Sequence, residues 1–147
     1  MSNDNRLDLT AFSERIATLR THVADNVVGQ SLPVHLLLTA LMADGHVLLE
    51  GVPGVAKTLL AKTLARLVRA DFRRVQFTPD LMPTDVLGTS IFNLGTQQFD
   101  FHPGPVFTQV LLVDEINRAP AKTQAALFEV MEERQVTLDG NTRRLDP

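Results

Sequence analysis

The sequence predicts an α/β fold: a parallel-core sheet with flanking helices and two β-hairpin insertions. From residue 31 onward, apolar runs typical of strands alternate with helical patterns, which favours a parallel sheet. A turn rich in Gly and Pro, residues 51–56, separates one such run from a helix. A nearly continuous apolar run, Gln109 to Val113, ends in Asp114-Glu115 and is typical of a strand buried on both faces.

Composition narrows the class of protein. The 147 residues suffice for one domain with a core, and 44% hydrophobic and 21% charged residues are ordinary for a soluble protein. A net charge of −3 gives no basic field for nucleic acid or anionic membranes. The absence of Cys excludes disulfides and thiolate metal sites and fits a cytoplasmic location. No apolar run approaches the roughly 20 residues that span a bilayer, and the polar N-terminus is not a signal peptide.

The N-terminal part predicts a helix followed by a connection. Apolar residues spaced three and four apart between Leu9 and Val23 indicate one amphipathic face. The connection after it contains Val28 and Gly29. We therefore assign residues 1–26 to an N-terminal helix and residues 27–147 to a separate domain.

A buried helix and a strand should come next. Ser31 is a plausible helix cap, several leucines make the helix apolar on most sides, and Gly45 should end it. The apolar run from His46 to Leu49 predicts a strand, and the pattern after the turn predicts a helix over residues 57–70.

The turn between that strand and helix is close to the phosphate-binding pattern G-x-x-x-x-G-K-[ST]. Ala56 replaces the last Gly, which requires negative φ there, so Gly54 is the expected site of positive φ. Backbone amides and the helix N-terminus would bind phosphate, Lys57 would reach the β and γ phosphates, and the Thr58 hydroxyl would hold Mg²⁺. The predicted nucleotide contacts in this stretch are Gly51, Val52, Pro53, Gly54, Val55, Ala56, Lys57, Thr58 and Leu59. In a nucleotide-binding domain over residues 27–147, Val28 and Gly29 are expected from their position to lie along the adenine. The alternative is an ordinary Gly/Pro loop before a helix.

The second half of the chain predicts two hairpins around the apolar run that ends in Asp114. The expected elements are a sheet-edge strand at 72–77, at most a short helix within 78–88, a hairpin at 90–101, a helix from 120 to about 134 and a hairpin at 136–145.

The acidic pair carries the predicted chemistry. Asp114 would hold Mg²⁺ through its water shell, and Glu115 would accept a proton from the attacking water or orient it. Ligands of parallel sheets bind at the carboxyl ends of strands, so the Lys57 turn and this pair should converge. The alternative is a polar end to a buried strand. The four His residues have no spacing typical of metal ligands.

Four blocks of sequence closely resemble the MoxR family of AAA+ ATPases, in which Ala at the position of Ala56 is usual. These blocks are residues 51–58, 77–88, 103–107 and 114–124. The resemblance implies an AAA+ P-loop fold with Walker A and Walker B motifs, ATP and Mg²⁺ as ligands, and ATP hydrolysis with Lys57 and Glu115 as catalytic residues. It also implies a ring-forming, hexameric, chaperone-like protein whose von Willebrand factor A domain partners help insert metal cofactors. The two hairpins would be the helix-2 insert and the pre-sensor hairpin, facing a pore or partner.

The family continues beyond this pattern with a sensor strand, an arginine finger and a helical lid, so the resemblance implies a chain truncated at Pro147. Without the central sensor strand, neighbouring strands must close a gap or leave backbone groups unpaired. We expect such a chain to bind nucleotide weakly and hydrolyse it poorly alone. One alternative is an interaction fragment that binds nucleotide without turnover. A DNA-translocating motor is disfavoured because no basic stripe is evident.

Overall fold

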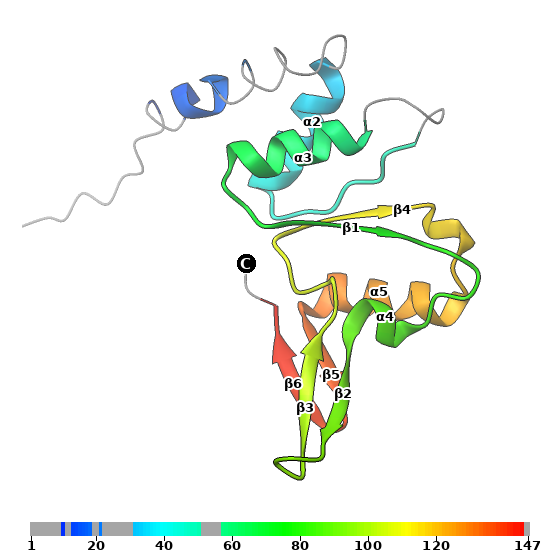
Figure 1. The fold of residues 1–147 in the computed structure, drawn as a ribbon. Helices are drawn as coiled ribbons and strands as arrows, with labels where there is room; N and C mark the ends of the chain where they lie inside the picture. The colour runs from blue at the N-terminus through cyan, green and yellow to red at the C-terminus, as the bar shows by residue number, and fades with distance from the viewer. Residues whose placement is uncertain (1–9, 11–12, 19–20, 22–30, 51–56, 146–147) are drawn as a thin grey trace, which may run out of the picture. The chain divides into compact units, whose positions relative to one another are not determined.

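The computed structural model describes residues 10, 13–18, 21, 31–50 and 57–145 (Figure 1). The chain divides into two compact units, residues 1–68 and residues 69–147. Each unit has its own hydrophobic core and is described by itself.

The first unit packs helix α2 (Ser31–Met42) against helix α3 (Lys57–Leu67). Its core joins Val34 and Leu38 of α2 to Leu60 and Leu64 of α3. The spacing of four residues within each helix places each pair on one face, as the apolar pattern of α3 predicts. The described residues between Thr10 and Thr21 are helical, in agreement with the predicted N-terminal helix.

Helix α2 is less buried than its composition suggests. Leu32 and Leu36 are 65% and 53% exposed, because the described residues that cover α2 lie over one of its faces. The helix also ends differently from the prediction. Asp44 takes the left-handed conformation at φ 53°, and the Gly45 amide then donates to Ala40 O at 2.8 Å. Gly45 therefore closes the helix end without itself supplying the positive φ.

The predicted strand from His46 to Leu49 is wrong for the structure described. Residues 45–50 take no regular structure, and Leu48 is 73% exposed. A strand exists only where a neighbour accepts and donates backbone hydrogen bonds, and the described strands pair only with one another. An apolar run alone does not supply that neighbour.

The second unit contains a parallel pair of strands, β1 (Phe72–Gln76) and β4 (Val110–Asp114). Their register places Phe72 opposite Val110 and Gln76 opposite Asp114. The edge character predicted for β1 is confirmed, since its arginines are exposed. The prediction that β4 is buried on both faces is wrong, because all five of its residues are only half-buried.

Both predicted hairpins are confirmed, the first with longer arms. Helix α4 (Pro83–Leu87) leads into β2 (Gly88–Asn93), which pairs antiparallel with β3 (Gln98–Pro103). The Asn93 side chain shapes the turn, because its Oδ1 accepts from Gly95 N at 2.9 Å. Strand β5 (Gln135–Leu138) pairs antiparallel with β6 (Asn141–Arg144). Positive φ at both Asp139 and Gly140, 52° and 73°, is typical of a type I′ hairpin turn.

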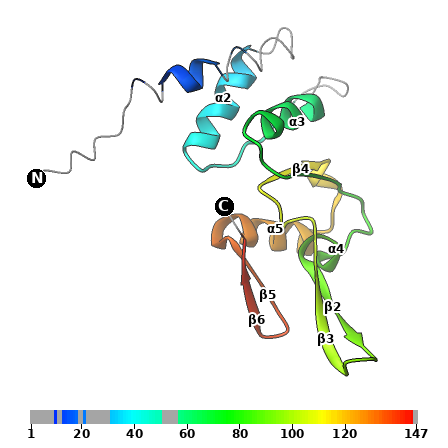
Figure 2. The ribbon, with the colours of Figure 1, turned by 60° about the vertical axis from the view of Figure 1, so that its left-hand side comes forward.

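Helix α5 (Ala121–Glu133) follows β4 and the short 3₁₀ helix η1 (Ile116–Arg118) and anchors the core of the second unit. The core residues it buries, Leu127 and Val130, meet Phe77, Val86 and Val136. Figure 2 shows both hairpins extending from the side of the unit where α4 and α5 lie. The Arg143 guanidinium of β6 lies 3.9 Å above the Phe101 ring of β3, so the two hairpins are in contact.

Candidate functional site

The predicted phosphate-binding residues lie at the start of α3. Lys57 and Thr58 are the first two residues of that helix and are half-buried, and Leu59 after them is exposed. The first turn of α3 carries no acidic residue, so its own side chains do not cancel the positive helix end. The remaining predicted contacts, residues 51–56 with Val28 and Gly29, lie outside the described residues.

The predicted acidic pair lies at the carboxyl end of β4, in the second unit. Asp114 is the last residue of the strand, and Glu115 follows it directly. The backbone fixes this end of the sheet, since Phe77 N donates to Asp114 O at 2.9 Å. The Asp114 side chain is 21% exposed, which leaves it reachable by a ligand.

An arginine on the neighbouring strand binds the Asp114 carboxylate. Arg74 Nε donates to Asp114 Oδ2 at 2.6 Å, and the Arg74 side chain is 50% exposed. Arg74 lies opposite Leu112 in the register, two residues before Asp114. Side chains two apart along a strand share a face, so Arg74 reaches Asp114 diagonally across the pair.

Glu115 has a different backbone conformation and a different partner from Asp114. It adopts the left-handed conformation, φ 56° and ψ 44°, immediately before η1. That conformation costs a residue with a Cβ atom about 1–2 kcal/mol. The Glu115 carboxylate then forms an ion pair with Arg118, Nε to Oε2, at 2.8 Å. The two adjacent carboxylates therefore have different partners, Arg74 for Asp114 and Arg118 for Glu115.

Sequence reasoning named both carboxylates and missed both of their arginine partners. Arg118 stands three residues after Glu115, a spacing that brings side chains together within a helical turn, so the sequence carried a signal for that pair. Arg74 needs the register of two distant strands, which the sequence does not give.

The donor set fits a magnesium ion carried by a nucleotide better than a metal held by protein alone. Among the described residues, no group of three or more His, Cys, Asp or Glu side chains could hold a metal ion. Mg²⁺ commonly keeps several waters and takes one or two protein carboxylates together with phosphate oxygens. A carboxylate offers about four lone-pair positions, so the bond from Arg74 does not use up the capacity of Asp114.

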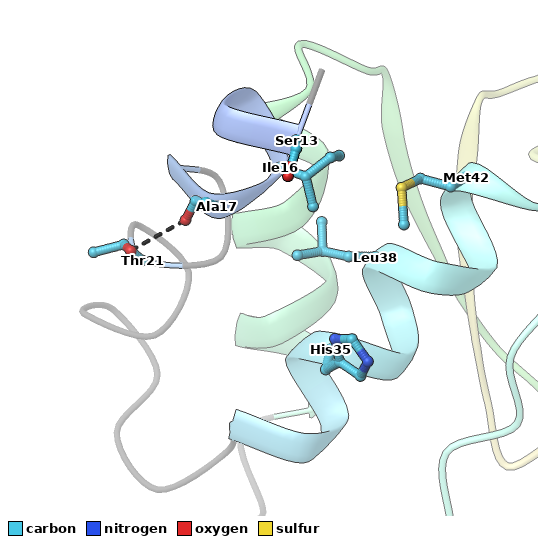
Figure 3. A pocket seen from close by; sticks show the side chains of 7 residues that line it. All are labelled: Ser13, Ile16, Ala17, Thr21, His35, Leu38 and Met42. Atoms are coloured by element: carbon cyan, nitrogen blue, oxygen red, sulfur yellow. Dashed lines mark hydrogen bonds between the residues drawn. The ribbon is translucent and has the colours of Figure 1, made fainter. Parts of the chain in front are cut away.

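A separate hollow of about 360 Å³ lies in the first unit (Figure 3). Its lining comes from the N-terminal helical residues and from α2: Ser13, Ile16, Ala17, Thr21, His35, Leu38 and Met42. Of the predicted site residues that the structure describes, Lys57, Thr58, Leu59, Asp114 and Glu115, none belongs to this lining. No helix in the described part of the chain is long and apolar enough to cross a membrane.

Comparisons with known proteins identify the family of this chain. The family described as "ATPase family associated with various cellular activities (AAA)" matches residues 46–147. The chain is 58% identical over 116 residues to Chaperone MoxR1 of Mycobacterium tuberculosis. The aligned segment covers 79% of this chain and 31% of that protein. It is 53% identical over 127 residues to the uncharacterized protein YeaC of Bacillus subtilis, covering 86% of this chain and 40% of that protein.

A solved structure supports the fold assignment. The crystal structure of a proposed ATPase from Cytophaga hutchinsonii matches with a TM-score of 0.75 and 44% sequence identity. The match covers 96% of this chain and 45% of that one. This chain therefore spans less than half the length of each of these three proteins.

Proposed function

Because this chain belongs to the MoxR family of AAA ATPases, we propose that it supplies the ATP- and Mg²⁺-binding residues of an ATP-hydrolysing module. The observation that carries the proposal is the acidic pair at the end of β4. Asp114 and Glu115 bind different arginines, Arg74 and Arg118, which is consistent with two separate roles.

Each named residue has one task in this proposal. Residues 51–56 bind the phosphates through backbone amides, Lys57 neutralises the β and γ phosphates, and Val28-Gly29 lie beside the adenine. Thr58 and Asp114 hold Mg²⁺, which when bound neutralises charge on the triphosphate. Glu115 receives a proton from water or orients it for attack. Glu115 must leave Arg118 to do so, and their exposure of 48% and 61% makes that exchange inexpensive.

The role of the whole protein is also a proposal. We propose that residues 27–147 form part of the ATPase domain, preceded by a helix in residues 1–26. The relative from Mycobacterium tuberculosis is named a chaperone. By analogy, the full-length protein would form a homo-oligomeric ring, a hexamer, that remodels partner proteins. Its partners would be von Willebrand factor A domain proteins, and its task would be metal cofactor insertion.

The test is phosphate release by the full-length protein. We expect Glu115→Gln to lower steady-state phosphate release by about 10²-fold or more while a fluorescent ATP analogue still binds. Glu129→Gln is the matched control, because Glu129 is an exposed side chain of α5, and its release rate should equal that of the unmodified protein. If the full-length protein releases no phosphate, or if Glu115→Gln loses none, the proposal of hydrolysis is wrong.

A second function, nucleotide-dependent binding without turnover, is favoured by the tip of the first hairpin. Leu94 and Phe99 are 85% and 71% exposed there, and Phe99 packs edge-to-face on the half-exposed Phe92 with ring centroids 5.2 Å apart. Exposed apolar clusters of this kind mark interaction sites. Unchanged partner binding with no phosphate release would support this second function.

A further inference from the structure

We propose that Arg74 is a positioning residue that binds the Asp114 carboxylate and competes with Mg²⁺ for it. The inference rests on the proposed function, because it assumes that Asp114 serves the metal. It adds a residue to the site whose removal should make the metal easier to bind.

The geometry of the pair is set by the sheet. Both residues belong to strands whose backbones are held in a continuous parallel register from Phe72 with Val110 to Gln76 with Asp114. The Nε to Oδ2 distance of 2.6 Å is short even for a hydrogen bond between charged groups. Arg74 therefore lies beside the carboxylate because of strand pairing and is not brought there by a loop.

The charge of Arg74 opposes a second cation at the same carboxylate. A divalent cation that uses Asp114 must share the carboxylate with Arg74 or displace it. Arg74 is 50% exposed, so solvent screens the effect and limits it to about two- to tenfold in the magnesium concentration required.

The adjacent residue of β1 provides a matched control. Arg73 has the same charge, but successive side chains of a strand point to opposite faces. Its Nη1 donates to Gly104 O at 3.4 Å instead of to the acidic pair. Arg73→Gln thus removes one positive charge from the same strand without freeing Asp114.

The experiment measures how much Mg²⁺ is needed for a fluorescent ATP analogue to bind the full-length protein. Arg74→Gln and Arg74→Met should each lower the magnesium midpoint by about two- to tenfold, and Arg73→Gln should leave it unchanged. Arg74→Lys, which keeps the charge, should stay within about twofold of the unmodified protein. As a readout independent of turnover, electron paramagnetic resonance should show Mn²⁺ binding more tightly to ADP-bound Arg74→Gln than to the unmodified protein.

Asp114→Asn distinguishes the metal role of Asp114 from the competition by Arg74. If that change leaves the magnesium midpoint where it was, the metal role of Asp114 in the proposed function is wrong. If Asp114→Asn raises the midpoint while both charge-removing changes at Arg74 leave it unchanged or raise it, only the competition by Arg74 is refuted. Thermal unfolding of every variant shows which of them fold, and two different replacements at Arg74 keep the comparison available if one does not.

Discussion

A buried hydroxyl in α5 gives the sharpest test of how the second unit is held together. Thr123 is 0% exposed, and its Oγ1 donates to Leu81 O at 2.7 Å. The bond ties α5 to the segment that precedes α4. Thr123→Val keeps the shape of the side chain and removes the donor, so the Leu81 carbonyl loses its partner.

The size of the effect follows from burial at both ends of the bond. An unsatisfied buried polar group costs about 1–3 kcal/mol. Leu81 is half-buried, so water partly reaches its carbonyl and the lower part of that range applies, about 1–2 kcal/mol. We expect Thr123→Val to lower the free energy of unfolding by that amount. The measurement is urea unfolding of the full-length protein followed by circular dichroism, with the slope m checked for constancy.

Two further variants separate the contributions. Thr123→Ser keeps the hydroxyl and removes one methyl group, so it should cost about 1 kcal/mol through packing alone. Thr89→Val makes the same replacement at an exposed position of β2 and should change the free energy of unfolding by less than about 0.5 kcal/mol. If Thr123→Val unfolds at the same urea concentration as the unmodified protein, the bond does not stabilise the unit and the reasoning fails.

Two other predictions concern the segments around α4. A Cβ at Gly104 would lie 2.3 Å from Val86 O. Gly104→Ala should therefore lower the free energy of unfolding in urea by about 2–4 kcal/mol. An unchanged unfolding midpoint would contradict that close approach. Hydrogen bonds from the Thr78 hydroxyl and, to a smaller extent, from the Asp80 backbone amide lower the pKa of the Asp80 carboxylate. Thr78→Val should therefore raise that pKa, as measured by NMR titration. Because the folded-state pKa is the lower one, this contribution to stability is present above the unfolded-state pKa and is lost as pH falls through the folded-state value.

Local sequence signals predicted the hairpins and helices of the second unit well. Asp139-Gly140 favours a tight turn by backbone preference alone, and α5 buries the residues that its apolar spacing indicates. The apolar run from His46 to Leu49 failed as a predictor because a strand depends on its neighbours. The run of apolar residues in β4 indicated two covered faces, but the strand is only half-buried.

The candidate site was predictable in part. Asp114 and Glu115 were found from their place at the end of an apolar run, and the structure places both at the end of β4. The left-handed backbone at Glu115 has no local signal, since Glu has no preference for that conformation. The turn at residues 51–56 and its approach to Asp114 stay predictions, because those residues are outside the described part of the chain.

The contact between Arg143 and Phe101 has a mechanical consequence for the two hairpins. The attraction between the Arg143 guanidinium and the Phe101 ring resists separation of the two hairpins. A force applied at the tip of one hairpin is therefore transmitted to the other. Probes attached to the two tips would then report correlated excursions. A partner that binds the first hairpin would thereby also displace the second hairpin, which follows directly after α5.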